Sequence, residues 1–192
     1  MRTSNRSKIL DAAIRVIERD GVTGVTFDAV AAEAGVTRGG MMYHFPSREA
    51  LIAAIHGHLA QQWEASLVES AGKSAAQASA SERYVAYART CAQSATRAEL
   101  LFMLDAPHAA QAASAWDEVL AQWAAPAPAP AAGDDPAALA QFIARLAADG
   151  MWVYEALSNA PLPADLRQRV AEQLTRMIQG SSTDPGKRPA RN

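Results

Sequence analysis

The chain has 192 residues, of which 49% are hydrophobic and 20% charged, a composition typical of a folded protein and incompatible with disorder throughout. No segment approaches the ~18 uncharged apolar residues of a membrane span, and residues 1–11 lack the apolar stretch of a signal peptide. The single cysteine excludes an internal disulfide. These features predict a cytoplasmic protein that does not associate with a membrane.

The net charge of -2 is distributed unevenly along the sequence. Residues 1–50 sum to +1, residues 51–179 to -5 and residues 180–192 to +2. Arg2, Arg6 and Lys8 have no acidic neighbour within the first ten residues, so they form a basic arm before the first predicted helix. This arm either meets phosphate groups or is simply solvated.

Three short helices are predicted within the first fifty residues. Apolar residues recur with a helical period over residues 7–20. Thr26 is placed to cap a second helix over residues 27–35, because its hydroxyl can accept a hydrogen bond from the exposed N–H groups of the first turn. Thr37 is placed in the same way to cap a third helix that ends at about His44.

A long fourth helix is predicted over residues 48–72, after a stop at Pro46 and a cap at Ser47. Its apolar positions recur every four residues, at Leu51, Ile55, Leu59 and Trp63. A helix of this length suits a strut that joins two domains.

The middle of the chain is predicted to contain three shorter helices and one loop. The helices are expected over residues 81–95, 97–105 and 109–124. Ser81 is the expected cap of the first of them. Residues 126–136 contain four prolines and a glycine, which break every helical pattern and therefore predict a loop.

Two helices with long apolar stripes are predicted next. Asp135 supplies a cap and Pro136 a first-turn proline for the helix over residues 136–158. Its stripe comprises Leu139, Ile143, Leu146, Gly150, Val153 and Leu157. The helix over residues 163–178 carries Leu166, Val170, Leu174 and Met177. Because no later element covers these stripes, we expect both helices to pair with their mates in a homodimer.

The segment from Thr26 to Phe45 has the layout of a helix-turn-helix. Small Ala31 lies where the second helix must come close, Gly35 lies at the turn, and Val36 is expected to be buried behind it. The pattern A-x-x-A-G-V can also occur in any helical hairpin, so its context matters. No segment shows strand alternation, and we therefore predict an all-α protein.

The order of parts over residues 6–52 resembles the N-terminal domain of the TetR family. The matching stretches are ILDAAIRVIERDG, TFDAVAAEAGV and TRGGMMYHFPSREAL. The shared spacing involves Thr26, Ala31, Gly35, Val36, Gly39, Phe45, Ser47 and Leu51. Met42 departs from the pattern, because the family usually has an aromatic residue there for a phosphate contact. Beyond residue 60 the resemblance is architectural.

The resemblance implies a domain organisation and a function. It implies an N-terminal three-helix helix-turn-helix DNA-binding domain over residues 1–46 and a larger helical ligand-binding and dimerisation domain over residues 47–179. Residues 180–192 are too polar and too rich in Gly and Pro to pack, so we expect a disordered tail. The implied protein is a homodimeric regulator of transcription, most simply a repressor, which binds a palindromic operator in double-stranded DNA and is released by a small-molecule effector.

Several residues are candidates for contacts to the DNA backbone. The hydroxyls of Thr26 and Thr37 and the guanidinium of Arg48 lie at predicted helix starts, where orphan N–H groups and a positive dipole end favour phosphate. Tyr43 and His44 carry hydrogen-bonding tips for phosphate or base edges, although His44 is also compatible with a packing role.

Other residues of the third helix are candidates for base reading and for close approach. Arg38 can reach guanine O6 and N7 with two parallel hydrogen bonds. Gly39 and Gly40 remove side chains where the backbone would approach DNA, at ~1 kcal/mol each in helix propensity. Phe45 is expected to be core.

Large aromatic residues are concentrated in the second predicted domain. The candidate ligand-binding residues are Trp63, Phe102, Trp116 and Trp152. An aromatic stripe is more often core than pocket, but the family resemblance implies a small-molecule cavity in this domain.

The remaining chemistry-bearing residues indicate neither a metal site nor catalysis. His56 and His58 are two apart and face different ways on a helix, so no metal and no cofactor is implied. Cys91 is expected to be a small buried filler, with an oxidation sensor as the minority alternative. No clustered acid, base or nucleophile points to an enzyme. A small-molecule binding protein with a vestigial DNA-binding domain is the alternative function, although Arg38, Tyr43 and Arg48 are all present.

Overall fold

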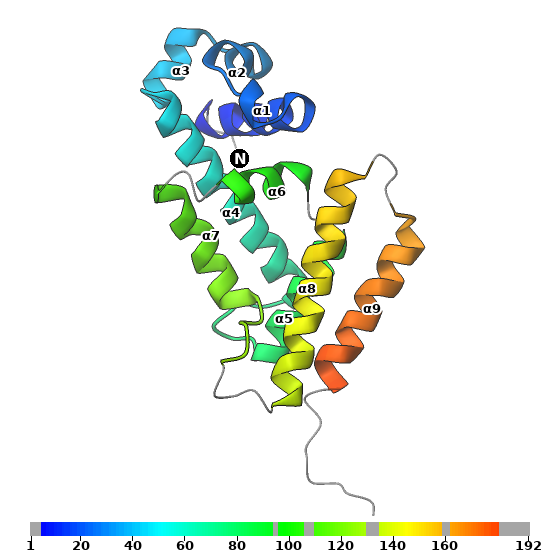
Figure 1. Cartoon of the computed structure of the whole chain (residues 1–192). Coiled ribbons are helices and arrows are strands. Elements are labelled where there is room, and N and C mark those ends of the chain that lie inside the picture. Colours follow the sequence, from blue (N-terminus) through cyan, green and yellow to red (C-terminus); the bar gives the residue numbers. More distant parts are fainter. Residues whose placement is uncertain (1–4, 94–95, 106–109, 130–134, 159–161, 181–192) are drawn as a thin grey trace, which may run out of the picture. The chain divides into compact units, whose positions relative to one another are not determined.

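The computed structural model describes residues 5–93, 96–105, 110–129, 135–158 and 162–180. All regular elements of this part of the chain are helices (Figure 1), which confirms the all-α prediction. The described residues divide into two compact units, one drawn from residues 1–65 and 96–119 and the other from residues 66–95 and 120–192. Of the tail predicted over residues 180–192, Gly180 ends a helix and the rest lies outside the described residues.

The first unit contains the N-terminal helices together with a later helical segment. Its elements are α1 (Asn5–Asp20), the short 3-10 helix η1 (Val22–Gly24), α2 (Phe27–Ala34), α3 (Arg38–His44), most of α4 (Arg48–Ala71), α6 (Arg97–Asp105) and most of α7 (Ala110–Trp123). The prediction of a basic arm before the first helix is wrong for Arg6 and Lys8, because both residues lie within α1, which begins at Asn5. Arg2 lies outside the described residues.

The helix boundaries near the N-terminus follow from local chemistry. Thr26 Oγ1 accepts a hydrogen bond from the Ala29 N–H at 3.1 Å, and Thr37 Oγ1 accepts one from the Gly40 N–H at 3.1 Å. Both predicted caps are therefore confirmed. Gly35, with φ +66°, ends α2 in the left-handed conformation that glycine adopts without a steric cost.

The core of the first unit is formed by the apolar stripes predicted from the sequence. The α4 stripe of Leu51, Ile55, Leu59 and Trp63 is buried. Phe45 is also buried, and the Arg6 guanidinium lies 5.3 Å from the centre of its ring. Val36 is only half-buried, so the prediction that it is buried in the turn was too strong.

The second unit is built around three mutually packed helices. These are α5 (Ala80–Gln93), α8 (Pro136–Leu157) and α9 (Ala164–Gly180), and the ends of α4 and α7 join them. Tyr87 of α5 is buried and donates its hydroxyl to Asp149 Oδ1 of α8 at 2.6 Å. None of the described helices combines the length and apolar character that a bilayer crossing requires.

One predicted cap in the second unit is confirmed and another is wrong. Asp135 caps α8 by accepting from the Ala137 and Ala138 N–H groups. Ser79, rather than Ser81, caps α5, because Ser79 and Glu82 form a reciprocal capping box: Glu82 N–H donates to Ser79 Oγ, and Ser79 N–H donates to Glu82 Oε2 at 2.8 Å. Lys73 adds an ion pair that, with this box, lowers the pKa of Glu82 to about 2.

Candidate nucleic-acid interface

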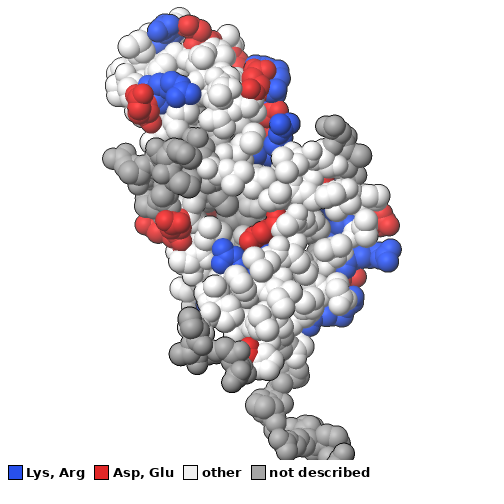
Figure 2. Space-filling view, in the orientation of Figure 1, with Lys and Arg blue, Asp and Glu red and all other residues white. Residues whose placement is uncertain are grey.

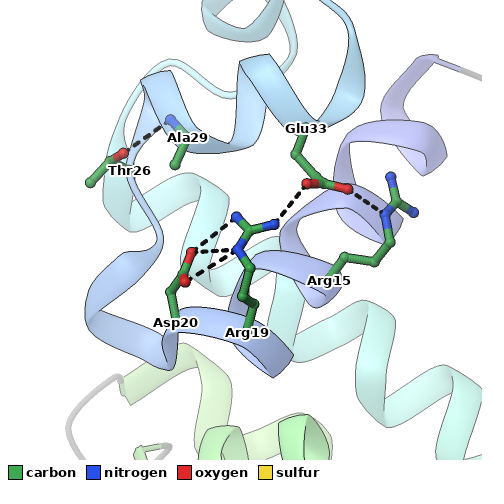
Figure 3. A network of polar contacts seen from close by, with 6 residues as sticks. All are labelled: Arg15, Arg19, Asp20, Thr26, Ala29 and Glu33. Atoms are coloured by element: carbon green, nitrogen blue, oxygen red, sulfur yellow. Dashed lines mark hydrogen bonds and ion pairs between the residues drawn. The ribbon is translucent and has the colours of Figure 1, made fainter.

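A polar network fixes α2 against α1 and thereby supports the helix-turn-helix (Figure 3). Glu33 of α2 accepts a hydrogen bond from Arg15 at 2.7 Å and from Arg19 at 3.1 Å. Arg19 also pairs with Asp20. The hydrogen bonds from Arg15 and Arg19 lower the pKa of the Glu33 carboxyl. Arg15 and Arg19 of α1 are thus engaged in contacts within the protein.

The helix α3 has one anchored face and one free face. Met41 and Phe45 are buried, whereas Tyr43 is 85% exposed and Met42 is half-exposed. Arg38 and Gly39 lie one turn before Met42 and Tyr43, so the four positions share the outward side of the helix. The predicted recognition helix is therefore held from behind and exposes its candidate contact residues.

The candidate phosphate-binding residues have defined partners within the protein. Thr26 and Thr37 accept hydrogen bonds from their own helices, and each hydroxyl keeps its own O–H as a donor. Arg48, at the start of α4, is exposed and donates from Nε to the Val25 carbonyl at 3.3 Å. His44 is half-buried, and its ring lies edge-on to that of Tyr43 at 5.2 Å.

Arg38 has a partner that sequence reasoning missed. Its Nη1 atom lies 2.9 Å and 3.0 Å from the two carboxylate oxygens of Asp28 in α2. Asp28 and Arg38 are ten residues apart on different helices, so no periodic pattern connects them. The only available signal was their opposite charge on either side of a predicted helix-turn-helix turn.

The two glycines of α3 have different surroundings. A Cβ atom built on Gly39 would meet nothing within 4 Å, so the fold itself does not require glycine there. A Cβ atom on Gly40 would lie 3.3 Å from Thr37 Oγ1 and would crowd the capping hydroxyl. Packing within the protein therefore accounts for Gly40 and leaves Gly39 unexplained.

Acidic and basic side chains intermix around these helices. On the visible face of the first unit in Figure 2, blue and red side chains lie next to one another. The described part of this unit thus presents acidic and basic side chains together on that face. Any attraction to a polyanion depends on the position of particular side chains more than on a large basic field.

The four candidate ligand-binding aromatics are buried and divided between the units. Trp63, Phe102 and Trp116 belong to the first unit, and Trp152 belongs to the second. Trp116 donates its indole N–H to Nδ1 of the buried His56 at 3.2 Å, and the Phe102 ring lies 4.6 Å from that imidazole. The sequence did not indicate this role for His56.

Two other polar contacts connect elements of the first unit. His58 Nε2 lies 3.0 Å from Asp11 Oδ1, which joins α4 to α1. Glu18 of α1 accepts a hydrogen bond from the Ala98 N–H in the first turn of α6, at 3.0 Å. Within the described ranges, no group of three histidine, cysteine or acidic residues is placed to hold a metal ion.

A capping box begins α6 next to Glu18. Glu99 is buried, and its Oε2 atom accepts hydrogen bonds from the Thr96 N–H and hydroxyl at 2.7 Å and 2.9 Å. Burial raises the pKa of the Glu99 carboxyl, and the nearby Glu18 charge raises it further, although the bonds from Thr96 act in the opposite direction.

The predicted apolar stripes of α8 and α9 differ in exposure. The α8 residues Leu139, Ile143, Leu146, Val153 and Leu157 are all exposed. On α9, Leu166 is exposed at the start of the helix, but Leu174 is only 4% exposed because it packs within its own unit. The uncovered apolar face of the second unit thus lies mainly on α8.

Comparisons with known proteins identify the family. Residues 9–55 match the model of the bacterial regulatory proteins of the tetR family, and residues 81–179 match that of the tetracyclin repressor-like C-terminal domain. The chain belongs to the TetR family of DNA-binding transcriptional regulators, in which an N-terminal helix-turn-helix domain precedes a helical ligand-binding domain. This class regulates transcription and does not catalyse a reaction.

Individual relatives match the chain to different extents. The HTH-type transcriptional regulator SrpR of Pseudomonas putida is 40% identical over 50 residues, which make up 26% of this chain and only 24% of SrpR. The multidrug binding protein EbrR complexed with malachite green is 25% identical, with a TM-score of 0.57 over 92% of this chain and 99% of its own. A transcriptional regulator from Rhodococcus sp. Rha1 has a TM-score of 0.70 at 20% identity, covering 95% of this chain and 100% of its own.

Proposed function

We propose that the protein is a cytoplasmic homodimeric repressor that binds a palindromic operator through α3 and is released from DNA by a small-molecule effector. The observation that carries the proposal is the outward face of α3. Arg38, Gly39 and Tyr43 are exposed there, while Met41 and Phe45 anchor the opposite face.

The contacts to DNA are proposed to be of two kinds. Arg38 reads guanine in the major groove through two N–H donors, and Gly39 lets the backbone of α3 approach the DNA closely. Thr26, Thr37 and Arg48 contact phosphates. These three residues fix the position of the protein and carry little sequence information.

Residues at the edges of α3 complete the proposed contact set. Tyr43 and His44 approach the backbone or base edges, and the high exposure of Tyr43 suits this role better than the half-buried ring of His44. Gly40 contributes by keeping the Thr37 cap free of a crowding Cβ.

The exposed apolar face of α8 supports the homodimer. A second copy of the chain that covers this face by two-fold symmetry would present two α3 helices to one duplex. Recognition helices about 34 Å apart then fit successive major grooves on one side of the DNA, which requires an inverted repeat in the operator.

We further propose that the effector is a largely apolar small molecule that binds among the aromatic residues, at Trp63, Phe102 and Trp116 in the first unit or at Trp152 in the second. EbrR, at 25% identity, has been crystallised with malachite green and with ethidium, both of which are cations built largely of aromatic rings. An effector that binds more tightly to a state in which the two α3 helices are not spaced to fit successive major grooves releases the protein from DNA.

The test compares Arg38→Ala with Arg48→Ala on a duplex that the wild-type protein selects from a randomised library. Arg38→Ala should weaken binding by ~1–3 kcal/mol and relax the preference at one base pair in each half-site. Arg48→Ala should weaken binding to all duplexes alike, because phosphates are the same in every sequence. If Arg38→Ala changes neither affinity nor base preference, the proposed readout is wrong.

A further inference from the structure

The ion pair between Asp28 and Arg38 contributes little to holding the fold together. Their side chains are 74% and 62% exposed, and exposed ion pairs add ~0–1 kcal/mol to stability. Glu33, the other acid of α2, provides the contrast, because it is mostly buried between two arginines of α1. Of these two acids, Glu33 fixes α2 in place, whereas Asp28 contacts a residue of the DNA-reading helix.

The geometry of the pair leaves one edge of the guanidinium available. Both Asp28 oxygens lie within 3.0 Å of Nη1. The edge formed by Nε and Nη2 is not used by Asp28. That edge carries two parallel N–H donors, which is the pattern that guanine O6 and N7 accept. Asp28 therefore restrains the side chain without occupying the donors needed for a base.

We propose that Asp28 is a positioning residue that orients Arg38 toward guanine and thereby sets the sequence specificity of the protein. This inference rests on the proposed role of Arg38 as the base-reading residue. A long arginine side chain loses rotamer freedom when it binds a base. Asp28 restricts that freedom before DNA arrives, so less of the contact energy is lost on binding.

The same carboxylate also weakens binding to DNA of any sequence. Asp28 lies two residues after Thr26, and the Arg38 that it contacts directly follows Thr37, so its charge lies close to two candidate phosphate contacts. A carboxylate near phosphates is repelled by them, whatever the sequence of the duplex. Asp28 thus favours the correct operator in two ways, by aiding the guanine contact and by penalising all other contacts to DNA.

The decisive variant is Asp28→Asn, which keeps the shape of the side chain but removes its charge and one of the two carboxylate oxygens. Glu118→Gln is the control for charge, because it removes one negative charge from an exposed position of α7 in the same unit and leaves the network between α1 and α2 intact. Both are measured on the duplex selected by the wild-type protein and on duplexes with each guanine replaced in turn.

Asp28→Asn should raise affinity for the substituted duplexes and lower the discrimination at the Arg38-dependent base pair by about 3- to 10-fold. Glu118→Gln should leave that discrimination unchanged. In an Arg38→Ala background, Asp28→Asn should raise affinity for all duplexes equally and alter no base preference.

Two results would overturn the inference, and they are distinguishable. If Arg38→Ala relaxes a base preference but Asp28→Asn does not, Arg38 reads the base without help from Asp28. If Arg38→Ala itself relaxes no preference, the proposed role of Arg38 fails together with the positioning role. Thermal unfolding of each variant identifies any loss of DNA binding that is due to loss of the fold.

Discussion

Replacing Leu146 and Val153 together by glutamate tests whether α8 faces a second copy of the chain. The two side chains are 53% and 38% exposed and lie seven residues apart on one face of the helix. Because they are already in contact with solvent within a single chain, substitution at these positions should change monomer stability by only about 0.5 kcal/mol. The effect on a dimer should be much larger.

The magnitude follows from the exposed area. Full burial of a leucine or valine side chain stabilises by ~1.5–3 kcal/mol, and roughly half of that, ~1 kcal/mol, remains to be gained at each position. Two-fold symmetry places each substitution in the interface twice, so the double variant loses ~4 kcal/mol before any cost of burying charge. This corresponds to about a thousand-fold weaker dimer.

The assay is light scattering over a range of protein concentrations, combined with thermal unfolding. Gln122→Glu, at an exposed position of α7, controls for added charge and should remain dimeric. Leu174→Glu should unfold the chain, because Leu174 is buried within its own unit. A wild-type protein that is monomeric at micromolar concentration, or a double variant that stays dimeric, would refute the reasoning.

Four other substitutions separate effects on stability from effects on binding. Gly39→Ala should stabilise the fold by ~0.5–1 kcal/mol, because nothing crowds the new Cβ, and it should weaken DNA binding. Gly40→Ala should not stabilise the fold, because its Cβ crowds the Thr37 cap. Melting temperatures and duplex titrations test both variants, and unchanged DNA affinity in Gly39→Ala would contradict the close approach of α3. Trp116→Phe removes the N–H that donates to His56 Nδ1, so it should lower the free energy of unfolding, measured with denaturant, by ~1–3 kcal/mol. If the variant instead alters only the quenching of indole fluorescence by ethidium, Trp116 lines a pocket and is not core. Burial raises the pKa of Glu99, so the folded chain keeps this proton at pH values where the unfolded chain has lost it, and stability falls as pH rises through that interval. Glu99→Gln should flatten this part of the stability profile, at pH values above the ordinary glutamate pKa of about 4.3, and an unchanged slope would show that other groups cause it.

Features that depend on neighbouring residues were predictable from the sequence. The caps at Thr26, Thr37 and Asp135 follow from side chains within three residues of the groups they satisfy. The error at α5 has the same origin, because both Ser79 and Ser81 can cap, and only Ser79 has an acid three residues later. The S-x-x-E pattern was in the sequence and would have decided the cap.

Features that depend on the packing of distant elements were not predictable. The pairs Asp28–Arg38 and His56–Trp116 join residues ten and sixty positions apart, and neither has a periodic signature. The stripe of α9 resembled that of α8 in sequence, yet Leu174 is covered by its own unit. Spacing identifies an apolar face, but it does not say whether the same chain or a second copy covers that face.

The central claim is that two copies of α3 read one duplex. The most direct test is selection of duplexes from a randomised library by the wild-type protein, followed by sequencing of the bound fraction. We predict an enriched inverted repeat whose half-sites each contain a required guanine and are centred about one helical turn, ~34 Å, apart. Enrichment of a single unrepeated motif, or no sequence enrichment under conditions where the protein is folded, would contradict the account.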